Sequence, residues 1–359
     1  MKRVKGISYL VLIIAVFAFL GLLLLKDIIT GDKPLLGEVK RLEVEGELVP
    51  VSNNSVIYYG NDIMIEGENS NIRAKNIEGT ILWSMKLHGD VTSINSCGEG
   101  YVVNIENKSI ITISKSGEML WEYEMVIPAS DIYCSDKGLL LIQYKESSYN
   151  SFEIFNIKGV KYSQGIINNA QVVSFDGTAD KNYTISMIDT SSGKIITRLA
   201  TYNNKGEIIW AQDFENVIIP RLIYNSRGEL ITVSDESMMK YRADGKLIKK
   251  EDFPNPLLKV SVSDDLMVII QKNKEFYDVF VYDLDLRQIG SAAFKSKPEG
   301  VFAGQKYFLI YDKDNLTMIS RQGNIMALYE SNIDINNAYI YDDTSIYIVS
   351  NRRLQKLIY

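Results

Sequence analysis

The sequence has few of the residues that most often carry metal-dependent or nucleophilic chemistry. It contains one histidine, His88, and two cysteines, Cys97 and Cys134, with no Cys-x-x-Cys or His-Glu-x-x-His segment. This scarcity excludes zinc and iron–sulfur sites built from such ligands. His88 lies in KLHGD, and the sequence places no serine or cysteine beside it, so we expect a surface histidine and no catalytic triad. We therefore expect no enzyme, no metal and no bound cofactor.

An excess of positive charge is also missing. The chain has 39 lysines and arginines against 45 aspartates and glutamates, a formal net charge of -6. Proteins that bind nucleic acid present a strongly basic surface. The charge balance therefore excludes nucleic acid as a partner of the whole domain.

Long uncharged runs are absent, with one exception at residues 7–25, ISYLVLIIAVFAFLGLLLL. As a helix, this run covers a hydrocarbon core about 30 Å thick. A cleaved signal peptide is the alternative, but the small-residue cleavage pattern is missing. Lys2, Arg3 and Lys5 precede the run, and positive charge stays on the cytoplasmic side. We expect a cytoplasmic tail at 1–6, a single-pass signal anchor at 7–25, a stalk at 26–38 and an extracytoplasmic remainder.

The remainder repeats a short turn motif. Gly79 opens GTILW, Gly117 opens GEMLW and Gly206 opens GEIIW, so that Trp83, Trp121 and Trp210 each stand four residues after a glycine. Degenerate copies begin at Gly159, Gly245 and Gly323, and Arg287 stands where a further turn is expected. A period of about 40 residues with four short strands per unit is typical of propeller blades. The sequence therefore predicts an all-β propeller.

The two ends of the repeat region predict how the ring closes. The last unit, NNAYIYDDTSIYIVSNRRLQKLIY, has only three strands, whereas residues 39–49, VKRLEVEGELV, form a strand without a unit. Pairing the two would remove an open sheet edge, which is otherwise a pairing hazard. We expect one propeller domain at 39–359 with eight blades. Seven blades remain the alternative if the long unit around residues 177–210 is misread.

The glycine-to-tryptophan turn resembles the motif of pyrroloquinoline-quinone-type propellers, a superfamily with WD40-like architecture. The resemblance implies that Trp83, Trp121 and Trp210 pack between neighbouring blades. The whole chain resembles the membrane-anchored propeller proteins of Gram-positive bacteria, a domain family without an established activity. Enzymes of the superfamily hold quinone and calcium beside two adjacent cysteines. Neither cysteine of this sequence matches that pattern, which argues against a quinone-dependent dehydrogenase.

Two further sets of residues allow alternative interpretations. Cys97 and Cys134 lie one repeat apart, near the ends of equivalent strands. One interpretation is an interblade disulfide, and the other is a pair of buried thiols. The acidic runs at 312–315 and 283–285 suggest calcium loops, but they lack the glycine and distal glutamate of an EF-hand. Acidic residues also favour tight turns, and we expect turns there.

Function is expected on the loops between blades and between second and third strands, which are long and varied: 145–151, 188–193, 254–258, 272–278 and 295–300. The sequence predicts a non-catalytic protein-interaction scaffold of the cell envelope, held at the membrane by its anchor. The alternative is a sensor that binds a small molecule or glycan in the central channel. The sequence does not identify the partner, the process or the oligomeric state.

Overall fold

The computed structural model describes residues 39–359, apart from 51–54, 61–62, 77, 148 and 352. The expected tail, anchor and stalk at 1–6, 7–25 and 26–38 lie outside the described residues. Within the described part, no helix has the length and apolar character needed to cross a membrane. Residues Arg41–Tyr359 form one compact unit.

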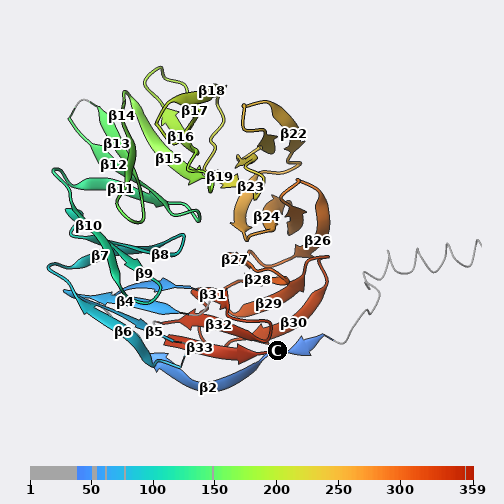
Figure 1. Ribbon diagram of the computed structural model, residues 1–359. Helices are drawn as coiled ribbons and strands as arrows, with labels where there is room; N and C mark the ends of the chain where they lie inside the picture. The colour runs from blue at the N-terminus through green and yellow to red at the C-terminus, as the bar shows by residue number, and fades with distance from the viewer. Residues whose placement is uncertain (1–38, 51–54, 61–62, 77, 148, 352) are drawn as a thin grey trace, which may run out of the picture. The chain divides into compact units, whose positions relative to one another are not determined.

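The described residues form eight antiparallel sheets arranged around a common centre (Figure 1). The prediction of an eight-bladed propeller is confirmed. In blades 1 to 7 the first strand lies nearest the centre and the next three strands follow outward in chain order. Second strands are largely buried, as in β12 (Leu139–Lys145) and β24 (Leu266–Asn273), because they have a neighbouring strand on each side and blades on both faces.

Blades 1 to 4 follow one another in chain order. They contain β3 (Val56–Tyr59), β4 (Met64–Glu68), β5 (Asn71–Lys75) and β6 (Ile81–Lys86); β7 (Val91–Cys97), β8 (Gly100–Ile105), β9 (Ser109–Ser114) and β10 (Met119–Glu124); β11 (Ala129–Cys134), β12 (Leu139–Lys145), β13 (Asn150–Asn156) and β14 (Lys161–Ile167); and β15 (Ala170–Gly177), β16 (Tyr183–Asp189), β17 (Ile196–Tyr202) and β18 (Ile208–Glu215).

Blades 5 to 7 repeat this pattern, and blade 8 combines the two ends of the repeat region. They contain β19 (Arg221–Tyr224), β20 (Leu230–Val233), β21 (Ser237–Tyr241) and β22 (Leu247–Asp252); β23 (Leu257–Val262), β24 (Leu266–Asn273), β25 (Phe276–Asp283) and β26 (Gln288–Phe294); β27 (Gly300–Ala303), β28 (Tyr307–Tyr311), β29 (Asn315–Ser320) and β30 (Ile325–Glu330); and β31 (Asn337–Ile340), β32 (Ser345–Ser350), β33 (Arg353–Ile358) and β2 (Glu43–Pro50).

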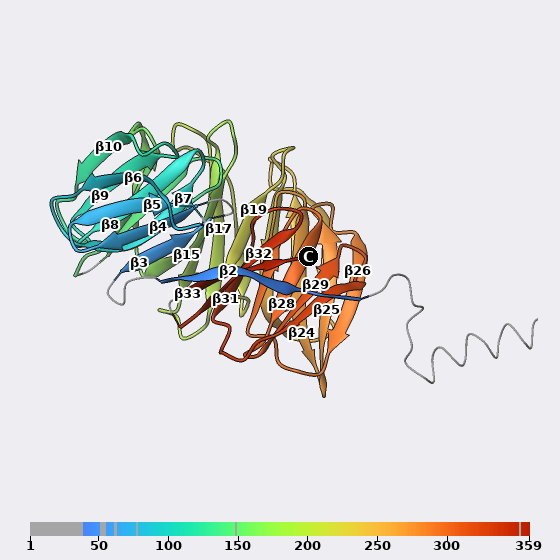
Figure 2. The same ribbon diagram turned by 90° about the horizontal axis from the view of Figure 1, so that it is seen from below.

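The ring closes through β2, which pairs antiparallel with β33 as the outer strand of blade 8 (Figure 2). The sequence predicts one continuous strand at 39–49, but the structure has two strands there. A two-residue strand, β1 (Lys40–Arg41), precedes β2, and the Leu42 amide donates to the Leu328 carbonyl of blade 7 at 2.9 Å. Leu42 is 2% exposed. The chain therefore anchors a leucine in blade 7 before it completes blade 8.

Neighbouring blades meet where a third-to-fourth turn packs on the fourth strand of the preceding blade. Gly117 of blade 2 has φ +89°, and a Cβ atom there would lie 2.5 Å from the Trp83 ring of blade 1. The same contact joins Trp121 to Gly159 and Trp210 to Gly245. Glycine is required at these turns by the positive φ and by the close approach of the ring.

Blades without tryptophan use the same junction with other side chains. Val49 of β2 lies against Gly79 and Ser163 lies against Gly206, whereas the atoms nearest to Gly323 belong to the backbone of Ser291. At the junction of blades 5 and 6, Lys249 Nζ donates to the Leu286 carbonyl at 2.9 Å. Leu286 has φ +60°, so the turn residue of blade 6 is Leu286 and not Arg287, the position marked by the repeat.

Candidate functional site

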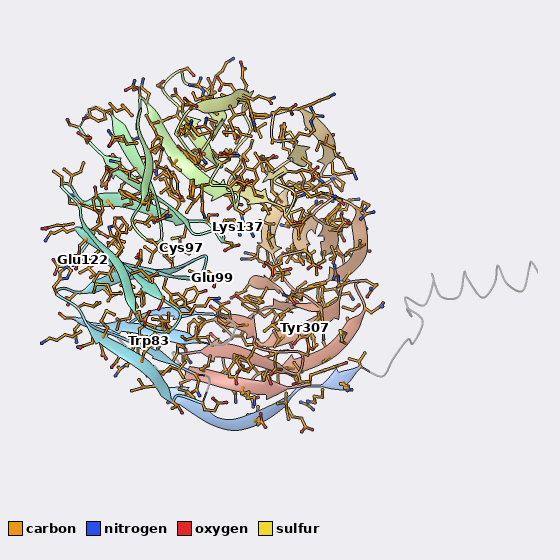
Figure 3. All side chains as sticks on the ribbon, viewed as in Figure 1. Trp83, Cys97, Glu99, Glu122, Lys137 and Tyr307 are labelled. Atoms are coloured by element: carbon orange, nitrogen blue, oxygen red, sulfur yellow. The ribbon has the colours of Figure 1, made fainter. Side chains whose placement is uncertain are left out.

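At the centre of the ring the described residues line a cavity of about 1010 Å³, the axial cavity. It opens among the turns between first and second strands, including residues 134–137, 263–264, 304–307 and 342–343. Side chains reach it from all eight blades, since every first strand ends there. Figure 3 shows Lys137 and Glu99 at the central ends of their blades and Glu122 at the outer side of the ring.

The predicted long-loop face has a smaller hollow of about 310 Å³, where the connection at 295–300 meets blades 6 and 7. Lys259, Glu299 and Tyr311 line it. The axial cavity therefore opens on the face with the shorter turns. The expectation that a partner binds the long loops stays a prediction.

A buried carboxylate holds one wall of the axial cavity together. Asp176 Oδ1 accepts from the Ser135 hydroxyl at 2.6 Å and the Gly177 amide at 2.8 Å, and Oδ2 accepts from the Tyr224 amide at 2.7 Å. These bonds join blades 3, 4 and 5. Burial raises the pKa of Asp176, although its three hydrogen bonds oppose the shift. Because its oxygens are already occupied, we assign Asp176 a structural role.

The exposed charges of the cavity are unevenly distributed. Lys115, Lys137 and Arg221 come from blades 2, 3 and 5, whereas Asp264 and Asp342 come from blades 6 and 8. The cavity thus has a basic side and an acidic side, and two charges have the opposite sign to their own side. They are Asp136 in blade 3 and Lys306 in blade 7, which forms an ion pair with Asp343 of blade 8.

Aromatic rings form part of the cavity wall near the acidic turns. Tyr58, Phe302 and Tyr341 are half-buried and come from blades 1, 7 and 8. Tyr307 is buried, and its hydroxyl donates to the Asp342 carbonyl at 2.6 Å. Burial raises the pKa of Tyr307 beyond the range in which a phenol ionises in ordinary buffers. The hydroxyl is therefore a neutral donor that fixes the turn carrying Asp342.

The structure brings two side chains to His88 that the sequence did not place there. Nε2 is hydrogen bonded to Ser109 Oγ at 2.8 Å, and Nδ1 lies 3.2 Å from Glu122 Oε1. His88 is exposed, as expected, and the sequence could not place Ser109 beside it, because the packing of β9 and β10 of blade 2 brings both partners to the connection from blade 1. Ser109 is 4% exposed, which leaves a substrate carbonyl no approach to its hydroxyl. These contacts hold the connection that carries His88 against blade 2.

The two cysteines meet at the wall of the cavity. Both are free thiols, with Cys97 buried and Cys134 half-buried. Cys97 Sγ donates to the Leu139 carbonyl at 3.4 Å, and Cys134 packs against the hydrophobic cluster that contains Cys97. The residues suggested as calcium ligands cap their own turns. Asp312 Oδ1 accepts from the Asn315 amide at 2.7 Å, and Asp283 Oδ1 accepts from the Arg287 amide at 2.9 Å.

Comparison with protein families gives one match over most of the chain. Residues 39–358 match a family of unknown function, DUF5711. The chain belongs to this family. The match begins where the described residues begin and covers the DUF5711 propeller almost completely. No curated protein matches the chain.

Solved structures are similar to this DUF5711 chain over about nine tenths of its length. BamB from Moraxella catarrhalis is 13% identical with a TM-score of 0.54, over 89% of this chain and 100% of BamB. The computationally designed Ika8 protein is 11% identical with a TM-score of 0.60, over 90% and 99%. Saccharomyces cerevisiae Sqt1 is 8% identical with a TM-score of 0.57, over 89% and 99%. At these identities the likeness shows the fold alone.

Proposed function

We propose that this protein is a non-catalytic scaffold, tethered to the cell membrane, that binds a protein partner at its axial cavity. The observation that carries the proposal is the divided charge of the cavity. Lys115 and Lys137 stand on one side and Asp264 and Asp342 on the other. A partner loop with acidic and basic residues in matching positions would satisfy both sides at once. Charge complementarity of this kind fixes orientation and raises the association rate.

The size and polarity of the cavity favour a protein loop over a compact apolar ligand. Pockets for small molecules are mostly lined by hydrophobic side chains. Here the lining includes charged side chains from seven of the eight blades, and the volume of about 1010 Å³ accommodates several residues. Rigid blades hold these turns, so a partner would meet preorganised charges.

A second candidate function is recognition of a glycan. The half-buried rings of Tyr58, Phe302 and Tyr341 share the cavity with the carboxylates of Asp264 and Asp342. Aromatic faces contact the apolar faces of sugar rings, and carboxylates accept hydrogen bonds from hydroxyl groups. Binding of purified envelope polysaccharide that Tyr341→Ala abolishes and Lys137→Glu leaves intact would favour this candidate over the scaffold.

The tether is the part of the proposal that rests on sequence. Residues 7–25 are the anchor, and Lys2, Arg3 and Lys5 orient it with the amino terminus inside. We expect the chain in the membrane fraction, resistant to high salt, with the propeller open to protease added outside intact cells. Protection of the propeller until lysis would contradict this orientation.

The partner site can be tested by photo-crosslinking in intact cells. A photo-reactive phenylalanine analogue replaces Lys137 or Lys306 at the cavity, or Lys274 on the long-loop face as a matched exposed control. We expect one and the same protein to be captured from both cavity positions and not from position 274. Adducts at position 274 alone would move the site to the long loops.

Binding of the captured protein should depend on the charges of the cavity. Binding of the purified partner to the full-length chain in detergent should fall at least about tenfold with Lys115→Glu or Asp264→Lys, which reverse one rim charge each. Lys274→Glu, a reversal on the opposite face, should leave the affinity unchanged. Equal affinities for all three variants would overturn the proposal.

A further inference from the structure

The two cysteines of the chain meet at one blade junction. Cys97 ends β7 of blade 2 and Cys134 ends β11 of blade 3, and no other cysteine is present in the 359 residues. Their side chains belong to one hydrophobic cluster. This packing between the first strands of blades 2 and 3 arises only in the folded protein. It brings the only two sulfhydryl groups of the protein into contact.

Two glycines allow this close approach. Gly98 follows Cys97 with φ +58°, and a Cβ atom there would lie 2.7 Å from the Gly138 amide nitrogen. Any larger residue at position 98 would push the two turns apart. The backbones beside the thiols are thus packed as closely as backbones allow.

Only one of the two thiols can be reached from outside. Cys134 lines the axial cavity, whereas Cys97 is 0% exposed and packs against blade 3. A reagent in the cavity therefore meets Cys134 first. The hydrogen bond with Cys97, together with burial, raises the pKa of the Cys134 thiol well above its usual value. Its thiolate is scarce at neutral pH, so exchange there is slow.

We propose that Cys97 and Cys134 are a dithiol modification site that a small disulfide of the glutathione class oxidises to an interblade disulfide. The Cys134 thiolate attacks the disulfide reagent, which forms a mixed disulfide and releases one thiolate. Cys97, as thiolate, then attacks the Cys134 sulfur, which forms the Cys97–Cys134 bond and releases the second thiolate. The two protons lost by the cysteines go to the released thiolates. The reagent is reduced by two electrons and the protein is oxidised by two. The bond would link blades 2 and 3 at the cavity wall.

The test uses the full-length chain in detergent with oxidised glutathione in alkaline buffer, which raises the thiolate fraction. After quenching in acid and unfolding, free thiols are counted with maleimide and the mass is measured. We expect the number of reactive thiols to fall from two to zero, with the loss of two hydrogen atoms and no retained glutathione. Peptide mapping should join the Cys97 and Cys134 peptides, and a reductant should restore both thiols.

Single-cysteine variants separate the two steps. Cys97→Ser removes the resolving thiol, so that glutathione should remain on Cys134. Cys134→Ser leaves only the buried thiol, which should stay unmodified until the protein unfolds. Wild-type protein that keeps a glutathione adduct on Cys134, or that forms only intermolecular dimers, would overturn the proposal. So would two unreacted thiols under conditions in which the Cys97→Ser variant is modified.

Discussion

The contact of Gly117 with Trp83 allows a sharp test of how neighbouring blades hold together. Gly117→Ala adds one methyl group that would lie 2.5 Å from the indole, on backbone with φ +89°. A left-handed conformation costs an L-residue about 1–2 kcal/mol. Overpacking a close contact costs about 1–3 kcal/mol more. We therefore expect this substitution to lower the free energy of unfolding by about 2–5 kcal/mol.

Gly193 is the matched control, because its φ is +77° and no atom lies within 4 Å of a Cβ built there. Gly193→Ala should cost only the backbone strain, about 1–2 kcal/mol. Both variants are unfolded in urea and followed by circular dichroism, and the slopes are compared with that of the wild type. The difference between the variants measures the contact with the ring. Equal losses of stability would refute the packing argument.

A double-mutant cycle tests whether the indole causes the additional loss of stability in Gly117→Ala. Trp83→Ala removes the ring atoms, which are the nearest ones to a new methyl at position 117. The Cβ atom of residue 83 remains, 2.9 Å from that methyl. Gly117→Ala should therefore cost less in the Trp83→Ala background than in the wild type. Additive losses would mean that the two positions do not interact.

Other parts of the structure give three further predictions. Lys240 is buried with its Nζ 2.6 Å from Asp285 Oδ1, and Lys240→Met should cost about 2–4 kcal/mol in urea unfolding. The lysine lowers the pKa of Asp285, so this stabilisation is present above the unfolded pKa of about 4 and is lost as the pH falls through the folded value. The variant should lose less stability on acidification, and an unchanged acid slope would contradict the pairing. Asp176→Asn should cost about 1–3 kcal/mol, because one acceptor oxygen is replaced by a donor; an unchanged midpoint would count against the tether between blades. Fluorophosphonate should label the native wild type no more than Ser109→Ala, whereas labelling that depends on Ser109 would reveal a nucleophile.

The number of blades could be predicted from the sequence because its signals are local. A turn that needs positive φ selects glycine, and the glycines at 79, 117, 159, 206, 245 and 323 mark six such turns. The seventh turn was displaced by one residue. Leu286 adopts φ +60° there and is 1% exposed, so burial of its side chain compensates for the backbone strain. A pattern that looks for glycine cannot find it.

Contacts between blades were harder to predict, because they depend on how far neighbouring sheets are apart and how they are tilted. Cys97 and Cys134 differ by about one repeat, which placed them on adjacent blades but did not show whether their thiols touch. His88 meets Ser109 and Glu122 only because the connection from blade 1 passes the outer strands of blade 2. Loop length pointed to one face of the ring, whereas the axial cavity lies at the other.

The blade junctions explain why a tryptophan motif kept in only three blades still marks a ring of eight. The turn residue has to satisfy a backbone requirement that few residues meet, and it is glycine in six blades. Its lateral partner only has to fill a gap, which Trp83, Val49 and Ser163 do with very different volumes. Lys249 fills the gap with a hydrogen bond to the Leu286 carbonyl, beside the ion pair of Lys240 with Asp285. The glycine therefore carries the repeat, and the tryptophan is one of several side chains that pack against it.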